Sequence, residues 1–205
     1  MNVMKAILRT LLVLTIVNFV SMSSVAQTTQ SDADFKRRVA EKVRLMTDYI
    51  SYMGSKNNPT DTRKFYGEKA LNLFIGKGYD YKDDGITKEG VMMQTTSATR
   101  DTTTTTLLRI YFDRLISLHY TKVVITSTEV ADMKVSDLKK IGKNLYVCTC
   151  QYVQYFCGYI GEDKAYGDIT TKRITCYIME EDTEDGKEYM ILLGDVQAIS
   201  TERTQ

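Results

Sequence analysis

The sequence predicts an α+β protein in which N-terminal helices pack on one face of a curved antiparallel sheet. Apolar residues recur at helical spacing over residues 33–53. The spacing becomes an alternating one from Lys122 onward. Residues 144–200 then form three long β-rich runs joined by two polar turns that contain glycine. Because amphipathic helices precede a meander of strands, the α+β class is favoured over an all-β sandwich.

The first 26 residues have the pattern of a secretory signal peptide. Lys5 and Arg9 give a positive start, an apolar run follows over Thr10–Val20, and Ala26 ends a small-x-small cleavage pattern. The run is too short to span a bilayer, which needs roughly 20 apolar residues. We therefore expect an exported protein of the periplasm or extracellular space, without stable membrane insertion after cleavage.

The rest of the chain predicts a single domain. We expect a flexible start over residues 27–32, one α+β domain over 33–200 and a C-terminal tail over 201–205. The formal net charge of the whole chain is +1. Since no basic patch stands out, the sequence gives no electrostatic indication of a nucleic-acid partner.

Three helices are expected before the main sheet. The first covers about residues 33–53, and the second about Asp61–Ile75, where following glycines would terminate it. The third ends near Leu118. We interpret the preceding Asp101–Thr106 as an N-terminal cap and extended lead-in to this helix. A short strand is expected over Val91–Ser97.

The strands of the expected sheet are separated by recognisable turns. A strand is predicted over Lys122–Val130, followed by a polar connection with a helical turn around Ser136–Lys140. Asp185-Gly186 is typical of a tight type I′ hairpin turn. Gly161–Gly167 is predicted to form a longer, more mobile hairpin tip.

No metal or cofactor site is predicted. Tyr79–Gly90 resembles a calcium loop, but Lys82 would stand at a ligand position and Val91 where a bidentate Glu is required. The single histidine, His119, lies far from the cysteines in the sequence, and their C-x-C spacing is too close for a zinc knuckle. No nucleophile-elbow, phosphate-loop or zinc-protease motif occurs.

The cysteines leave two interpretations open. If the hairpin tip centres near Asp163, Cys150 stands opposite Cys176. An exported protein favours a disulfide between these two, whereas buried thiols in the sheet are the alternative. Cys148 and Cys157 are expected to remain thiols.

The order of elements resembles the NTF2-like and cystatin-like α+β superfamily, and more closely a group of small exported bacterial proteins. The matching segments are MMQTTS, LLRIYFDRLISL, YTKVVIT, YGDITTKRITCYI and MILLGDVQAIST. This resemblance implies a bent antiparallel sheet that wraps around helices to form a cone. It implies the fold more than a function, because the class hosts enzymes, carriers and assembly modules.

Enzymes of this class hold a carboxylate and a tyrosine inside the cone, so the resemblance implies candidate residues here. The carboxylate candidates are Asp195 and then Asp168. The tyrosine candidates are Tyr146, Tyr152, Tyr155 and Tyr177. Tyrosines in a β-rich chain mostly pack across strands, so catalysis is the less favoured interpretation.

The leading hypothesis is a non-enzymatic exported binding or assembly module of the cell envelope, with an unknown protein or small molecule as partner. Tyr159 and Tyr166, at the long hairpin tip, are its expected contact residues. The alternative is a small-molecule carrier, or an isomerase- or dehydratase-type enzyme, that uses the cone interior. A cavity of several hundred Å³ with a buried carboxylate would favour the alternative, and an interior filled by apolar side chains would exclude it.

Overall fold

The computed structural model describes residues 32–83, 86–183 and 186–204. The chain divides into two compact units, Met1–Arg37 and Arg38–Gln205, which are treated separately. The predicted signal peptide, and all but the last residue of the predicted flexible start, lie outside the described residues. The described part of the first unit is helical and carries the ion pairs Lys36–Asp32 and Arg37–Asp34.

The second unit begins with a helix over residues 38–54. The helices that follow are α2 (Thr60–Leu71) and α3 (Leu108–Ile116), and short 3₁₀ turns cover Ile75–Gly78 and Val130–Asp132. The strands are β1 (Tyr81–Asp83), β2 (Ile86–Lys88), β3 (Met92–Ser97), β4 (Arg100–Leu107), β5 (Lys122–Ser127), β6 (Lys134–Val135), β7 (Lys139–Gly142), β8 (Leu145–Ile160), β9 (Asp163–Thr183) and β10 (Gly186–Arg203).

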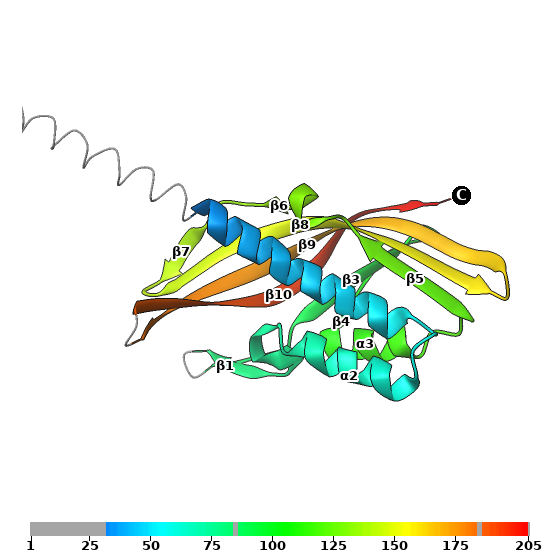
Figure 1. Ribbon diagram of the computed structural model, residues 1–205, viewed down its shortest axis with the longest axis horizontal. Coiled ribbons are helices and arrows are strands. Elements are labelled where there is room, and N and C mark those ends of the chain that lie inside the picture. The colour runs from blue at the N-terminus through cyan, green and yellow to red at the C-terminus, as the bar shows by residue number, and fades with distance from the viewer. Residues whose placement is uncertain (1–31, 84–85, 184–185, 205) are drawn as a thin grey trace, which may run out of the picture. The chain divides into compact units, whose positions relative to one another are not determined.

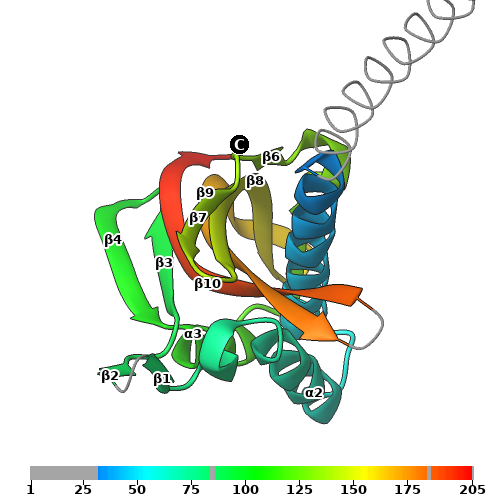
Figure 2. The same ribbon diagram turned by 90° about the vertical axis from the view of Figure 1, so that its left-hand side faces the viewer.

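The main sheet of the second unit has the strand order β4-β3-β10-β9-β8-β5, with β6 and β7 also paired to β8. It is strongly curved, and the helix over residues 38–54 crosses its inner face in Figures 1 and 2. The α2 and α3 helices lie side by side below the same face. The predicted α+β fold, with helices packed on a curved sheet, is therefore confirmed. The sheet is mixed, since β3 runs parallel to β10 at Met93 and Val196.

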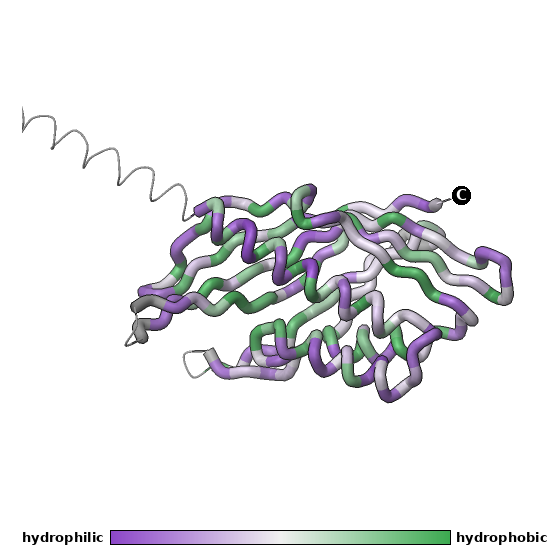
Figure 3. Tube along the Cα trace, viewed as in Figure 1, coloured by the Kyte–Doolittle hydropathy of each residue, from purple (hydrophilic) through white to green (hydrophobic). Residues whose placement is uncertain are grey.

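The core forms where apolar faces of the sheet and the first helix meet. Val43, Met46 and Ile50 of this helix are fully buried, as are Ile174 and Ile178 of β9. Figure 3 shows apolar residues along the helices and long strands, and hydrophilic residues at the β8–β9 turn. The apolar stripe and the strand alternation that predict these elements thus define the buried faces.

Several predicted boundaries are wrong. The threonine run is extended, as the predicted lead-in required, but it does not cap the helix: it lies in β4, which pairs with β3 through Thr104–Thr95 and Thr106–Met93. β-branched residues fit a pleated, half-buried surface better than a helix start. The α2 helix ends at Leu71, earlier than predicted, and β10 continues to Arg203, through most of the predicted tail.

The turns also differ from the predictions. The β8–β9 turn occupies only Gly161 and Glu162, and Ile160 pairs with Asp163, so the predicted long tip is part of the strands. The predicted helical turn in the polar connection is replaced by an extended segment that leads into β7. The predicted hairpin turn at Asp185-Gly186 falls partly outside the described residues, although Thr183 and Gly186 pair on either side of it.

Candidate functional site

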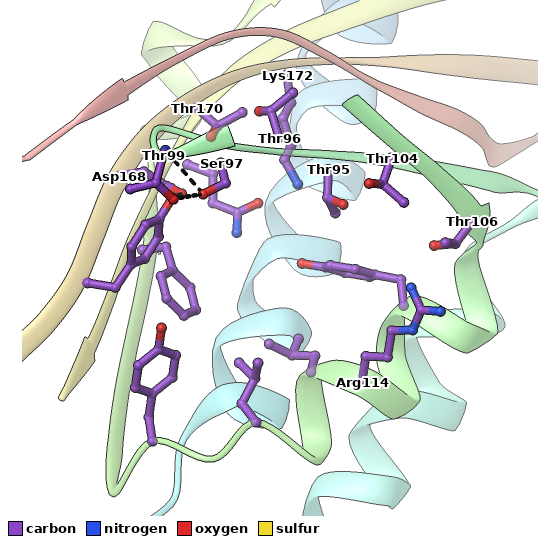
Figure 4. A pocket seen from close by; sticks show the side chains of 17 residues that line it. Thr95, Thr96, Ser97, Thr99, Thr104, Thr106, Arg114, Asp168, Thr170 and Lys172 are labelled. Atoms are coloured by element: carbon purple, nitrogen blue, oxygen red, sulfur yellow. Dashed lines mark hydrogen bonds between the residues drawn. The ribbon is translucent and has the colours of Figure 1, made fainter. Parts of the chain in front are cut away.

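A cavity of about 560 Å³ opens between the β3–β4 hairpin, the α3 helix and the adjoining ends of β8 and β9 (Figure 4). It lies wholly within the second unit. The lining residues are Thr95, Thr96, Ser97, Thr99, Thr104, Thr106, Tyr111, Arg114, Leu115, Leu118, Tyr120, Gln154, Phe156, Tyr166, Asp168, Thr170 and Lys172. The volume suits a drug-sized molecule.

The α3 wall of the cavity is positioned by cations at its C-terminal end. Lys56 Nζ donates to the backbone oxygens of Ile116 and Leu118, at 3.2 and 2.5 Å, and Arg63 Nη1 donates to Ile116 O at 2.6 Å. These donors satisfy carbonyls that a helix end leaves unpaired, and their charge complements the helix dipole. The apolar lining residue Leu115 and the rim residue Arg114 are fixed as a result.

One glycine allows an aromatic ring to reach the cavity. A Cβ on Gly158 of β8 would lie 2.7 Å from ring atoms of Tyr120. Tyr120 also packs against Phe156, with ring centroids 5.9 Å apart. Without a side chain at Gly158, these two rings together form an apolar wall.

The opposite wall consists largely of hydroxyl groups. The β3–β4 hairpin contributes Thr95, Thr96, Ser97, Thr99, Thr104 and Thr106. Figure 4 shows these side chains around the opening, with Thr170 and Lys172 of β9 beside them. Thr170 Oγ1 forms a hydrogen bond of 3.0 Å with Thr201 Oγ1, which is also bonded to Thr96 Oγ1. The cavity therefore offers one hydroxyl-rich side and one apolar side.

At one end of the cavity, Tyr166 and Asp168 form a hydrogen-bonded pair. Tyr166 donates to Asp168 Oδ2 at 2.6 Å, and the Ala98 N–H donates to Tyr166 Oη at 3.0 Å. Because the single Tyr166 proton goes to Asp168, the Ser97 hydroxyl, 2.9 Å away, donates to Tyr166. Burial raises the pKa of Asp168, against the lowering effects of Tyr166 and Lys172.

Lys172 provides a buried amine in the same cavity. Its side chain is only 4% exposed and reaches the cavity from β9 (Figure 4). Burial lowers the pKa of Lys172 to about 8, although the Asp168 carboxylate acts in the opposite direction. The Nζ atom lies 3.8 Å from Met93 Sδ and 5.5 Å from the Tyr111 ring centroid. A thioether and a ring face compensate a buried charge poorly.

Gln154 adds an unsatisfied acceptor to the cavity. It is 6% exposed, and its Oε1 atom has no hydrogen-bond partner among the described residues. Burial raises the pKa of the neighbouring Tyr111 to about 12, so this phenol is a neutral donor at physiological pH. A buried polar atom without a partner is uncommon and is expected where a ligand supplies the missing hydrogen bond.

Of the predicted carboxylates, Asp168 lines the cavity and Asp195 does not. Asp195 is exposed on β10, and its Oδ1 accepts a hydrogen bond of 2.8 Å from the Met92 N–H. This bond ties β3 to β10 beside the irregularity between Leu193 and Val196. The structure thus gives Asp195 a role in strand pairing outside the cavity.

The predicted cone tyrosines also lie elsewhere. Lys140 Nζ lies 5.5 Å from the centroid of the Tyr146 ring. Tyr177 and Asp195 line a separate hollow of about 250 Å³. Tyr152 is buried in the sheet without lining the cavity, and Tyr155 is 41% exposed. The tyrosines of the cavity are Tyr111, Tyr120 and Tyr166 instead.

The two tyrosines expected to contact a partner have different environments. Tyr159 is half-buried, and Lys122 Nζ lies 4.9 Å from its ring centroid. Tyr166 is turned into the cavity and bonded to Asp168. Since the β8–β9 turn is short, the two tyrosines do not form a joint exposed surface at a loop tip.

The predicted cysteine register is also wrong. Cys148, not Cys150, pairs with Cys176, whereas Cys150 pairs with Ile174. The tight turn at Gly161 and Glu162 moves the pairing by two residues from the predicted one. All four cysteines lie among the described residues and are free thiols. The pKa of Cys150 is raised to about 12, chiefly by burial, and that of Cys176 is raised, chiefly by its hydrogen bond with Cys148.

Sequence reasoning missed Lys172, Gln154 and the threonine wall. The signal was nevertheless present in β9, where Tyr166, Asp168, Thr170 and Lys172 alternate along one face. The same face of β9 becomes apolar at Ile174 and Ile178. Helices therefore cannot cover the whole of this face with apolar side chains.

Among residues 32–83, 86–183 and 186–204, no cluster of three or more His, Cys, Asp or Glu side chains could hold a metal ion. Within the same residues, no helix combines the length and apolar character needed to cross a membrane.

No family model and no curated protein matches the chain significantly. Among solved structures, it is similar to a proposed scytalone dehydratase from Novosphingobium aromaticivorans, with a TM-score of 0.40 and 10% identity over 86% of this chain and 92% of that one. It is also similar to a protein from Kribbella flavida, with a TM-score of 0.37 and 11% identity over 83% and 95%. Both are distant likenesses. The residues of the cavity themselves fit a ligand-binding or enzyme-like module.

Proposed function

We propose that this chain is an exported small-molecule-binding module that holds its ligand in the cavity between β3, β4, α3, β8 and β9. The observation that carries the proposal is a cavity of about 560 Å³ into which the buried ionisable groups Asp168 and Lys172 both face. Ionisable side chains are rarely buried unless they are paired or serve a site. Export rests on the pattern of the first 26 residues.

The lining supports a particular class of ligand. Hydroxyl groups of the β3–β4 hairpin face rings and leucines contributed by α3, β8 and the segment after α3. A ligand with one apolar or aromatic face and hydroxyl or carbonyl groups on its edge would match both sides. The Gln154 Oε1 atom, which has no partner among the described residues, would accept a hydrogen bond from such a ligand.

The presence of this cavity also favours binding of a ligand in the interior over binding of a partner at the β8–β9 turn. Tyr166 is engaged with Asp168, Ser97 and Ala98, which leaves it unsuited to contact a protein partner at an exposed tip. The proposal is therefore a carrier or binding protein for a small molecule.

The threonine run offers a matched test. Thr106 lines the cavity and pairs with the buried Met93, whereas the neighbouring Thr105 is exposed and does not line it. We expect Thr106→Phe to narrow the cavity and Thr105→Phe to leave it open, while aromatic residues at both positions suit a strand.

The measurement is the thermal stabilisation of the full exported chain by a set of ring-sized, hydroxyl-bearing compounds. A ligand that binds only the folded state raises the melting temperature. Compounds that stabilise the wild type should also stabilise Thr105→Phe and should lose their effect on Thr106→Phe. Equal stabilisation of both variants would contradict binding in the cavity.

A further inference from the structure

Within this site, and resting on the proposed function, we propose that the Lys172 amine forms a reversible imine with an aldehyde or ketone group of the ligand. The ligand would then be held covalently at one point and by contacts elsewhere. Lys172 is suited to this because it is buried at the cavity wall and lies outside any ion pair among the described residues.

The surroundings of Lys172 favour a neutral amine. Its Nζ atom lies 3.8 Å from a thioether sulfur, Met93 Sδ, and 5.5 Å from the centroid of the Tyr111 ring. A lysine that only stabilised the fold would be expected to reach a carboxylate or solvent, as long side chains usually do. Here the chain ends in the cavity instead, where neither group solvates an ammonium ion well.

Neutrality matters because only the unprotonated amine is a nucleophile. With a pKa of about 8, about one Lys172 side chain in ten is neutral at pH 7, compared with fewer than about one in a thousand for an ordinary lysine. Lysines exposed on the surface, such as Lys164, are not buried in this way. Burial therefore distinguishes Lys172 from them by reactivity as well as by position.

The proposed step is balanced without an oxidant or reductant. The lone pair of Nζ attacks the carbonyl carbon, a C–N bond forms, and the carbonyl oxygen takes up a proton while nitrogen loses one, which gives a neutral carbinolamine. That hydroxyl group then leaves as water with a second proton, while nitrogen loses a proton and the C=N bond forms. The sum is amine plus carbonyl giving imine plus water, and it is reversible.

The cavity contains groups that can exchange these protons and hold the rest of the ligand. Asp168 lies on the same face of β9, and burial raises its pKa, which makes it a better proton donor near neutral pH than an ordinary carboxyl. The Tyr111 phenol, beside the Lys172 amine, is a neutral donor. Hydroxyl groups of Thr95 and Thr106 are available to the edge of the ligand.

The test is reductive trapping with 4-hydroxybenzaldehyde. The full exported chain is incubated with this aldehyde and cyanoborohydride near pH 7, and the adduct is located by peptide mass spectrometry. We expect one hydroxybenzyl group per chain, on Lys172. Lys172→Met should abolish the adduct. Lys164→Met, which removes an exposed lysine of the same strand, should leave it unchanged.

A non-carbonyl analogue separates the two proposals. Binding of 4-hydroxybenzyl alcohol, measured by calorimetry, reports on the cavity alone. If the alcohol binds and the aldehyde gives no adduct on Lys172, imine formation is wrong and the proposed function stands. If adducts appear only on surface lysines, imine formation at this site is equally wrong. If neither compound binds to the wild type nor labels Lys172, this ligand class, and the imine with it, is rejected.

Discussion

The β9 strand presents one face to two different environments. At one end of that face, Tyr166, Asp168, Thr170 and Lys172 line a cavity. At the other end, Ile174, Cys176 and Ile178 are fully buried in the core. The same alternation therefore produces a binding surface in one half, the cavity half, and a packed interior in the other, the core half.

Burial alone therefore does not identify a residue whose role is to stabilise the fold. Lys172 and Ile174 are neighbours on the same face, at 4% and 0% exposure, yet only the second has a side chain suited to an apolar interior. The fold tolerates the cavity half because the core half, with the helix over residues 38–54, supplies the hydrophobic stabilisation. The following predictions test this division.

The largest effect is expected in the core half. Ile174→Ala removes fully buried methyl and methylene groups, so we expect a loss of about 2–5 kcal/mol in the free energy of unfolding. Thr104→Ala, in the exposed part of the cavity wall, should change it by less than about 0.5 kcal/mol. Chemical denaturation measures both, and losses of similar size would contradict the division.

Lys172→Met should stabilise the protein. The lowering of the Lys172 pKa from 10.5 to about 8 corresponds to a cost of about 3 kcal/mol for the buried charge at pH 7. Between about pH 8 and 10.5 the unfolded state binds more protons than the folded state at this group. Its contribution to the free energy of unfolding therefore rises with pH across that window.

The measurement is the difference in unfolding free energy between the wild type and Lys172→Met as a function of pH. The comparison with the variant is needed because the pKa values of Cys150 and Tyr111 are raised to about 12. These two groups therefore lower the free energy of unfolding at high pH and oppose the rise that Lys172 causes. Lys164→Met serves as the control on the same strand. A difference that is constant from pH 7 to 10 would mean that Lys172 is not desolvated.

A smaller effect is expected at the Tyr166–Asp168 pair. Tyr166→Phe leaves the Ala98 N–H, the Ser97 hydroxyl and Asp168 without their shared partner, at a cost of about 1–3 kcal/mol. It also removes a hydrogen bond that lowers the pKa of Asp168, so this already raised pKa should rise further.

Because the pKa of Asp168 is raised in the folded state, the sign of its contribution to stability as a function of pH follows. A carboxyl with a raised pKa in the folded state favours folding when protonated, and this contribution is lost as pH rises from the ordinary Asp pKa of 3.8 through the folded pKa. In Tyr166→Phe the loss should end at a higher pH. Carbon NMR of the Asp168 carboxyl checks this, and a lower pKa in the variant would be inconsistent with the hydrogen bond.

The smallest effect concerns thiol reactivity. Cys157 of β8 is half-buried, whereas Cys150 of β8 and Cys176 of the core half are fully buried. We expect a single fast phase with a disulfide reagent in the native protein, and Cys157→Ser should remove it with little change in stability. Fast modification of Cys150 or Cys176 would show that the core half opens.

Periodic patterns predicted most of the elements because they report which face is buried. The stripe through Val43, Met46 and Ile50 identified the first helix, and alternation identified β8–β10. The Thr102–Thr106 run carried no such contrast, since every residue is a threonine, although its partner β3 lies directly before it in the sequence. A strand of identical residues has no periodicity to detect.

The residues of the site could not be predicted from the spacing of residues in the sequence alone. A two-residue error in the β8–β9 turn changed the partner of Cys176 from Cys150 to Cys148. Asp195 was preferred to Asp168, but its carboxylate accepts a hydrogen bond from the Met92 N–H, where β3 meets β10. Which of two strand carboxylates faces a cavity depends on how helices cover the sheet, and that is set by long-range packing.

The most direct test of the cavity as a ligand site is amide chemical-shift mapping with 4-hydroxybenzyl alcohol. We predict saturable shifts at Thr95, Thr106, Gln154, Thr170 and Lys172, and little change at Ile178 or Leu193 of the core half. Thr106→Phe should weaken the response and Thr105→Phe should preserve it. Shifts scattered over both halves, or equal responses in the two variants, would contradict the proposed site.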